Sequence, residues 1–399
     1  MDFELHYSEG QEEFRKEVWT WLEANVPRFD LSSDGAKQSM AARQGAADFR
    51  RKLGTKGWLA PNWPKEYGGG GLSLAETIVI DEELSQWDVA STGDLGLSLG
   101  APAIMVWGTE EQKKRFLPPI LKGEITTWQC FTEPEAGSDL ASLKTRAEWN
   151  GSEYVINGQK IFIGSPFPPD YIYTLAVTDP EAPRHRNIGA FIIPAKSPGV
   201  TIQPLKLIAG GGRNTIFYDN VRVSPDQLIG GKTDGWRVAQ STLEVEHGGG
   251  GRVVARDQVV DDLLAYYKEA KRSGKPLSRD SHIKERLVDL YIQSEIGRLF
   301  GLRGYWMRAT KTRLVGYEGS QNALHGKKYF VNLATILLEV LGPTALVDDP
   351  KWAPLKGNLE YYQRFAACQH QGGTPEIQKV IIARRMGVSR TRETAAAMV

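Results

Sequence analysis

The chain has 399 residues, of which 41% are hydrophobic and 24% charged, so we expect two or three globular domains with a sizeable apolar core. A formal net charge of +1 argues against nucleic acid or an anionic surface as a partner. No apolar run approaches the roughly 18 residues that span a bilayer, so we expect no membrane insertion.

The first third of the chain has a helical pattern. Phe14, Val18 and Leu22 form an apolar stripe between charged residues. A loop rich in Gly, Pro and Trp follows over residues 58–71. Two more helices are expected at Leu74–Gln86 and Glu110–Leu117. We predict an N-terminal helical domain over residues 1–126.

The middle of the chain, residues 127–234, has the pattern of an antiparallel β domain. Its segments are short and rich in β-branched and aromatic residues, and Asn-Gly and Ser-Pro-Gly turns separate them. The expected strands include Tyr154–Ile156, Tyr171–Val177, Ile188–Ile193 and Thr215–Val223.

The last region, residues 235–399, is again helical. Long periodic runs cover Val253–Lys271, His282–Thr312 and Gly326–Leu341. The whole chain therefore predicts an α+β fold of helical domain, β domain and helical bundle, with a ligand cleft between domains. Two cysteines, Cys130 and Cys368, exclude a disulfide framework or a zinc site, and we expect no metal and a reducing, cytoplasmic compartment.

Four motifs resemble the acyl-CoA dehydrogenase family, in the family's order and across almost the whole chain. The most specific is Cys130–Asp139, which contains Thr-Glu-Pro-Glu-Ala-Gly-Ser-Asp. The others are Trp63–Gly69, Asn157–Ile163 and Gly372–Gln378. The resemblance implies an N-terminal helical bundle, a middle antiparallel β domain and a C-terminal four-helix bundle. It also implies FAD, an acyl-CoA substrate and a role in fatty acid or lipid catabolism.

A flavin needs N–H and hydroxyl donors at its polar edge and a flat apolar wall along its ring. By resemblance, Thr132 bonds the ring near N5, Phe131 gives backbone contacts, and Ser138 lies by the pyrophosphate or the CoA arm. Phe162 takes the place of the ring-flanking aromatic, although a strand aromatic can equally be core. Thr374 and Glu376 fall on the cofactor side, with a structural role for Glu376 as the alternative.

The chain departs from the family pattern at three places. Gly164 lacks the family's hydroxyl next to flavin N5, so either Ser165 supplies one or Thr132 acts alone. Many members carry an R-x-x-F-G motif whose Arg reaches the FAD of a neighbouring subunit. Here the corresponding stretch begins with Arg272 but continues Ser-Gly-Lys-Pro-Leu, so by resemblance Arg272 alone is left to contact a pyrophosphate. Glu339 and Gly342 occupy the second adenine-side segment, which also differs from its commoner form.

The reaction needs a carboxylate that removes the α-proton while a hydride leaves Cβ for flavin N5. The commonest family position for this Glu is Gly372 here, which cannot act as a base. The isovaleryl-CoA dehydrogenase-like position is Glu246, with Glu244 as the nearest competitor. By resemblance, the Gly372 N–H and the ribityl hydroxyl of FAD polarise the thioester carbonyl.

Two features follow the expected base directly. His247 either orients Glu246, lines the acyl pocket or is an incidental helix residue. Gly248 begins a run of four glycines, which are costly inside a helix. The run leaves room for a bulky, cyclic or branched acyl group, or serves close packing or a helix break.

Two alternatives remain open on the sequence. One is a flavin monooxygenase of the same superfamily, against which the carboxylate of Glu246 argues. The other is the cofactor-binding subunit of a heteromeric dehydrogenase. The resemblance implies electron-transferring flavoprotein as the oxidant of the reduced cofactor, and a homodimer or homotetramer.

Overall fold

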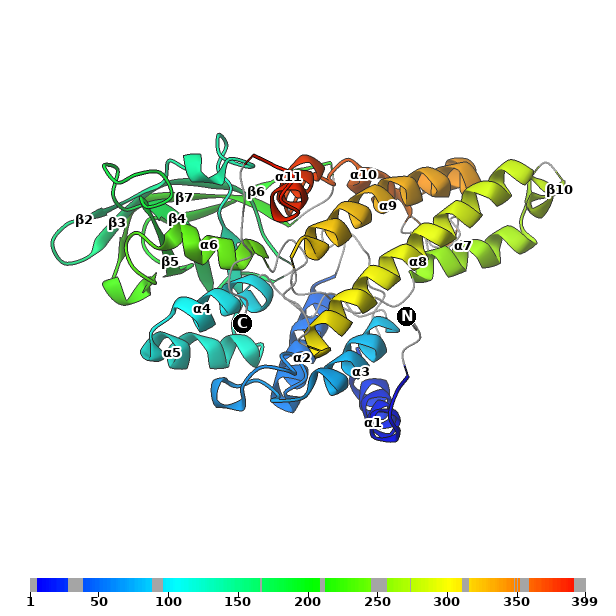
Figure 1. The fold of residues 1–399 in the computed structure, drawn as a ribbon, viewed down its shortest axis with the longest axis horizontal. Coiled ribbons are helices and arrows are strands. Elements are labelled where there is room, and N and C mark those ends of the chain that lie inside the picture. The colour runs from blue at the N-terminus through cyan, green and yellow to red at the C-terminus, as the bar shows by residue number, and fades with distance from the viewer. Residues whose placement is uncertain are drawn as a thin grey trace.

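The computed structural model describes residues 6–27, 39–87, 96–165, 167–208, 212–244, 257–272, 274–310, 316–347, 349, 351 and 359–390. The molecule is elongated, with a β-sheet at one end and long helices at the other (Figure 1).

The N-terminal region is helical, as predicted. Its elements are α1 (Glu9–Asn25), α2 (Met40–Lys56), η1 (Lys65–Tyr67), α3 (Leu74–Ser85), η2 (Gly96–Gly100), α4 (Ala101–Trp107) and α5 (Glu110–Leu121). Helices α1, α3 and α5 each begin with a capping box, in which Ser8, Ser73 or Thr109 exchanges hydrogen bonds with the residue three positions on. The core of the first helices contains Val18, Leu22 and Phe49.

The middle region is one eight-stranded sheet in the order β6-β7-β3-β2-β4-β5-β8, with β1 paired to β4. The strands are β1 (Thr127–Cys130), β2 (Arg146–Trp149), β3 (Tyr154–Ile163), β4 (Tyr171–Val177), β5 (Ile188–Pro194), β6 (Val200–Leu205), β7 (Arg213–Val223) and β8 (Leu228–Ile229). Most pairs are antiparallel, as predicted, but β4 pairs in parallel with both β1 and β2. Two short helices interrupt the sheet sequence, η3 (Leu140–Ser142) and η4 (Pro225–Gln227).

The C-terminal region contains α6 (Gly235–Glu244), α7 (Gln258–Glu269), β9 (Lys271–Arg272), β10 (Lys275–Pro276), η6 (Leu277–Arg279), α8 (Ser281–Thr310), α9 (Glu318–Leu341), η7 (Gly342–Leu346), α10 (Leu359–Ala366) and α11 (Pro375–Arg385). Helix α6 lies apart from the others, against the sheet (Figure 1). It shares a core with α4, α5 and β5 through Val238 and Ala239. A second core, between α7, α8 and α9, contains Leu290, Leu333 and Ile336.

One helical segment in the described part of the chain, Glu318–Leu346, is long and apolar enough to cross a membrane by length and composition. This corrects the expectation that no apolar run has that length. The isolated polar residues within the segment do not lower its mean hydropathy enough to exclude it. Leu333, Ile336, Leu337 and Val340 of this segment are buried in the C-terminal core. A core helix of a globular protein passes the same test, and 39% of the most apolar window of this segment is buried.

Candidate active site

The loop after β1 is tied to β3 by a buried ion pair. The Lys160 ammonium donates to Glu133 Oε1 at 2.7 Å and to the Phe131 carbonyl at 3.2 Å. The Lys160 side chain is 0% exposed and that of Glu133 6%. Glu133 also accepts from the amides of Lys144, at 2.6 Å, and Thr145, at 3.0 Å. The loop is therefore anchored on β3 and on the segment that leads into β2.

Burial and charge oppose each other at this pair. Burial raises the pKa of Glu133, but the Lys160 charge and the hydrogen bonds lower it more, so the pKa lies below its usual range. Burial lowers the pKa of Lys160, against the opposing effect of Glu133. A carboxylate at this depth requires the positive charge beside it.

Thr132 is held from both sides, yet its own donors are unused. Its carbonyl accepts from the Ile161 amide at 2.9 Å, and Lys160 fixes the carbonyl before it. Among the described residues, neither the amide nor the hydroxyl of Thr132 has a hydrogen-bond partner. Thr132 is half-buried, whereas Ser138, further along the loop, is exposed. Two donors of Thr132 are thus available to a ligand.

Phe162 occupies an unusual position on β3. The pairing of β3 with β7 shifts register between Lys160 and Ile163, and Phe162 has φ +63°. Its side chain is 50% exposed. A left-handed backbone is uncommon for a bulky residue, and such strain is often found at functional sites. The alternative that Phe162 is core packing is wrong.

Gly164 is explained by a close approach of the chain. A Cβ at this position would lie 1.9 Å from the Gly212 carbonyl oxygen, so no larger residue fits. The hydroxyl of Ser165 exchanges hydrogen bonds with the backbone of Phe167, at 3.3 and 3.4 Å. The Ser165 hydroxyl is therefore used within its own turn. The Thr132 hydroxyl, by contrast, has no hydrogen-bond partner among the described residues.

Buried contacts join the loop to α6. The rings of Phe131 and Tyr173 meet edge to face at 5.0 Å between centroids. The Tyr173 hydroxyl lies 3.0 Å from the Thr242 hydroxyl, and both residues are buried. Trp107 of α4 holds the same helix by donating to Ser241 at 3.0 Å. The end of α6 is thus fixed relative to the loop.

The turn before α11 contains a backbone amide without a hydrogen-bond partner among the described residues. Gly372 and Gly373 have φ +61° and +75°, the left-handed region that favours glycine. The Gly372 carbonyl accepts from Gln378 at 3.1 Å. Its amide has no hydrogen-bond partner in the described ranges. Thr374 caps α11 by accepting from Ile377 at 3.1 Å, and Glu376 is exposed in the first turn.

The residues of the expected adenine side meet at the end of α9. Arg272 donates to the carbonyls of Glu339 and Val340, both at 2.8 Å. Gly342 ends the helix with φ +62°. The Glu339 carboxylate accepts from Arg286 at 2.9 Å. Arg272 and Glu339 thus have contacts within the chain.

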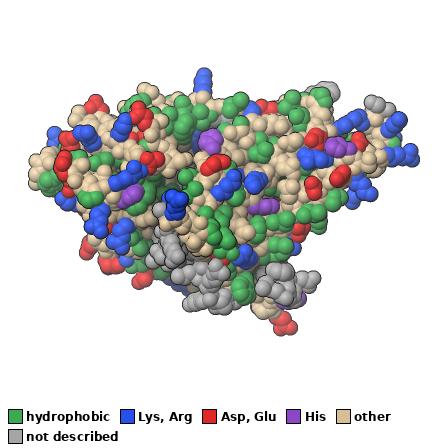
Figure 2. Space-filling view, turned by 45° about the horizontal axis from the view of Figure 1, so that its top comes forward, with side chains coloured by type: hydrophobic (Ala, Val, Ile, Leu, Met, Phe, Trp, Pro, Cys, Tyr) green, Lys and Arg blue, Asp and Glu red, His purple; other side chains and the backbone are tan. Residues whose placement is uncertain are grey.

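This end of the molecule lies opposite the sheet (Figure 1). Lys and Arg side chains gather on it (Figure 2). The exposed cations of this end include Lys268, Lys271, Arg272, Lys275, Arg279 and Lys284. The structure therefore does not bring Arg272, Glu339 and Gly342 to the loop that contains Thr132.

Three expected site residues, Glu246, His247 and Gly248, lie outside the described residues. Sequence reasoning missed the Glu133–Lys160 pair, although both residues belong to the motifs, and the approach of Gly212 to Gly164. An acid in one motif and a lysine in the other were the available signal for the pair. In the described ranges, no three His, Cys, Asp or Glu residues are grouped as metal ligands.

Three family models match the chain in succession. They are the N-terminal domain of acyl-CoA dehydrogenase over residues 8–124, the middle domain over 129–221 and the C-terminal domain over 233–387. "Acyl-CoA dehydrogenase IpdE1" of Mycobacterium tuberculosis is 30% identical, over 94% of this chain and 97% of that protein.

Solved structures agree over the full length. One described as "Tcur3481-Tcur3483 steroid ACAD" has a TM-score of 0.81 and 28% identity, covering 98% of this chain and 100% of that chain. The ChsE4-ChsE5 complex from Mycobacterium tuberculosis has a TM-score of 0.81 and 27% identity over the same shares. The chain belongs to the acyl-CoA dehydrogenase family, whose members depend on FAD, and it is a flavoprotein oxidoreductase that dehydrogenates acyl-CoA.

Proposed function

We propose that the chain holds FAD on the loop after β1 and uses Glu246 to remove the α-proton of an acyl-CoA thioester. The observation that carries the first part is Thr132, whose amide and hydroxyl lack partners among the described residues while both neighbouring carbonyls are fixed. FAD, when bound, supplies the acceptor for the hydrogen and electrons that leave Cβ.

The described residues around Thr132 fit a flat, polar-edged ring. Thr132 offers two donors, and Phe131 lies next to it on a buried ring contact with Tyr173. Phe162 offers an exposed aromatic face on a strained backbone. Ser138 offers an exposed hydroxyl further along the loop, suited to a phosphate or to the CoA arm.

The position of α6 supports Glu246 as the base. Helix α6 is held at Thr242 by Tyr173, whose ring contacts Phe131 beside Thr132. Glu246 follows Thr242 by only four positions in the sequence. Gly372, the alternative position for the base, carries no carboxylate. His247 and Gly248 are proposed to border the acyl group.

The Gly372 amide is proposed to stabilise the thioester carbonyl. Proton removal from Cα places negative charge on the carbonyl oxygen, and a fixed N–H lowers the energy of that charge. The Gly372 carbonyl is held by Gln378, which fixes the turn. Thr374 and Glu376, at the start of α11, are proposed to face the cofactor.

A second chain is proposed to complete the FAD site. Arg272, Glu339 and Gly342 lie at the end of the molecule opposite the sheet, so they suit the FAD of a neighbour (Figure 1). A homodimer or homotetramer provides this neighbour. A related partner chain is the alternative, since one similar structure is the ChsE4-ChsE5 complex.

The electron acceptor and the cellular compartment of the enzyme are also proposals. Electron-transferring flavoprotein is proposed to reoxidise the reduced cofactor, as the family resemblance implies. Cys130 and Cys368 are both free thiols, which suits the reducing cytoplasm.

A bulky or cyclic acyl group is the proposed substrate. The similar structure described as a steroid ACAD supports a ring-bearing group. The glycines that begin at Gly248 lack side chains that would compete with such a group for space. Straight long-chain thioesters are expected to react less well.

Anaerobic titration of the purified protein with a panel of acyl-CoAs tests the proposal. Cyclic or branched thioesters should bleach the flavin, and Glu246→Gln should lose bleaching while retaining FAD. Bleaching that persists in Glu246→Gln would reject this base. Preference for straight chains would reject the substrate class. Native mass with and without a candidate partner chain distinguishes a homo-oligomer from a heteromer.

A further inference from the structure

We propose that the buried Glu133–Lys160 pair is a positioning device, which fixes the Phe131–Thr132 peptide so that the donors of Thr132 face the flavin. Neither residue is proposed to touch the reacting atoms. The inference rests on the proposed function, because it assumes that Thr132 contacts FAD.

The pair connects two motifs that are separate in the sequence. Lys160 donates to Phe131 O and to Glu133 Oε1, and the next residue on β3, Ile161, donates to Thr132 O. Every residue from Phe131 to Glu133 is thus bonded to β3. Glu133 in turn holds the amides of Lys144 and Thr145.

The geometry of the peptide bond, together with these hydrogen bonds, fixes the direction of the Thr132 N–H. In a trans peptide the carbonyl and the following N–H point in opposite directions. Lys160 holds the Phe131 carbonyl on the buried side of the loop, so the Thr132 N–H points away from Lys160. The carbonyl of Thr132 is fixed by Ile161, which leaves Thr132 little freedom to turn.

The same strand residues also set Phe162. The register of β3 against β7 shifts just after Lys160, and Phe162 lies inside this shift with φ +63°. The bonds at Lys160 and Ile161 therefore fix both the loop donors and the start of the strained turn that exposes the aromatic ring.

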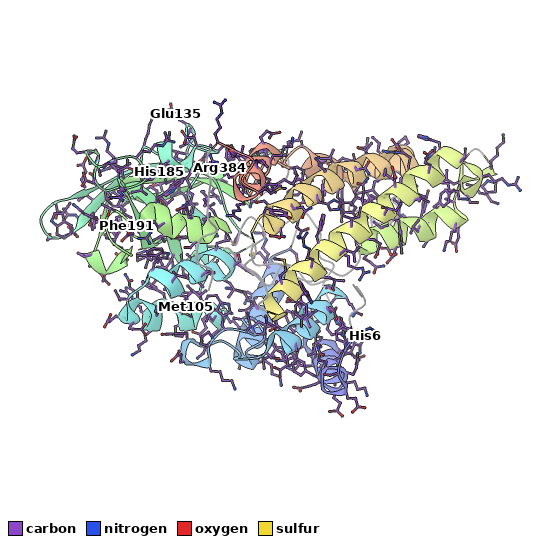
Figure 3. All side chains as sticks on the ribbon, in the orientation of Figure 1. His6, Met105, Glu135, His185, Phe191 and Arg384 are labelled. Carbon is purple, nitrogen blue, oxygen red and sulfur yellow. The ribbon has the colours of Figure 1, made fainter. Side chains whose placement is uncertain are left out.

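A contribution to folding stability does not by itself explain why the chain has a buried ion pair here. Replacing a buried ion pair by apolar residues of similar volume is often neutral or stabilising. The same loop contains an exposed pair, Glu135 with Lys144, whose side chains are 69% and 73% exposed. Figure 3 labels Glu135 at the outer edge of the sheet domain. This pair provides a matched control.

The test uses the full-length protein as wild type, Lys160→Met, Glu133→Gln, the double variant and the control Glu135→Gln. FAD affinity is measured on reconstitution of the apoprotein, together with the flavin spectrum, the melting temperature, kcat and KM. We expect Lys160→Met to weaken FAD binding and lower kcat by about tenfold or more each. KM for acyl-CoA should stay close to wild type, and Glu135→Gln should match wild type throughout.

The double variant separates positioning from folding. It removes both charges, so its melting temperature should approach that of wild type, while FAD binding should stay weak because the Phe131 carbonyl has lost its donor. Wild-type FAD affinity and spectrum in Lys160→Met or in the double variant would overturn the inference. A double variant that fails to fold would also overturn it, since the pair would then be structural.

Failure of the proposed function looks different. In that case wild type and Glu135→Gln would themselves bind no FAD and oxidise no acyl-CoA. That result would reject the proposed function and this inference together.

Discussion

Two charged clusters lie at opposite ends of the molecule, and they differ in burial. Lys160 and Glu133 in the sheet domain are 0% and 6% exposed, whereas Arg286 and Glu339 near the end of α9 are 26% and 33% exposed. The buried pair organises the backbone of the loop around itself. The half-exposed pair sits among cations that remain accessible to solvent (Figure 2). Both clusters make contacts within the chain, but only the second also presents charged side chains to solvent, where another molecule can reach them.

The largest expected effect comes from removing one carboxylate at each end of the molecule. Glu133→Leu leaves Lys160 buried without its partner and should lower the free energy of unfolding by about 3–5 kcal/mol. Glu339→Leu removes a partly solvated pair and should cost no more than about 1 kcal/mol. Urea unfolding of both variants measures the difference. Equal losses would contradict the contrast between the two ends.

The second prediction restores the hydroxyl that the family carries at position 164. Gly164→Thr places a Cβ against the Gly212 carbonyl and should destabilise the protein by about 1–3 kcal/mol without improving FAD binding. Ser165→Ala is the control, since it removes only a local turn contact and should cost about 1 kcal/mol. Thermal unfolding compares the two, and a stable Gly164→Thr would reject the steric explanation.

The third prediction separates stability from cofactor binding at Phe162. Phe162→Gly relieves the left-handed backbone but adds chain entropy, so the free energy of unfolding should change by less than about 1 kcal/mol. FAD binding should weaken, because the aromatic face is lost. Trp149→Ala, which removes a 51% exposed aromatic on β2, should leave FAD affinity unchanged. A loss in both variants would contradict a specific role for Phe162.

The smallest effect is expected from acid titration of the buried pair. The pKa of Glu133 is lowered in the folded protein from its ordinary value of 4.5. Its contribution to stability is therefore fully present above about pH 4.5 and is lost as the pH falls through the folded pKa. The groups facing it are Lys160 and the amides of Lys144 and Thr145. Unfolding of wild type and Glu133→Gln between about pH 6 and pH 3 should show a steeper loss in wild type.

Periodicity predicted most of the elements well. The strand at Tyr171–Val177 has the predicted bounds, and the helix predicted from Leu74 ends one residue earlier than expected. The boundaries at residues 126 and 234 remain predictions. The helix ending at Leu341 was predicted too, but its full length was underestimated because its first turns are polar.

The candidate site was only partly predictable. The resemblance of their motifs to the flavin-binding segments of the family identified Thr132 and Phe162 as candidates. The motifs could not show the left-handed backbone of Phe162, which depends on a register shift against β7. Nor could they show why Gly164 is glycine, because Gly212 approaches it from a distant part of the chain.

The most direct test of the central claim is proton exchange at Cα, measured apart from the oxidation. The substrate is an acyl-CoA analogue whose Cβ is replaced by sulfur, so it cannot be dehydrogenated. In D₂O the wild-type holoenzyme should exchange the α-protons, as followed by NMR. Glu246→Gln should slow the exchange by about 10²–10⁴-fold while retaining FAD. Exchange at the wild-type rate in Glu246→Gln would contradict the assignment of this residue as the base.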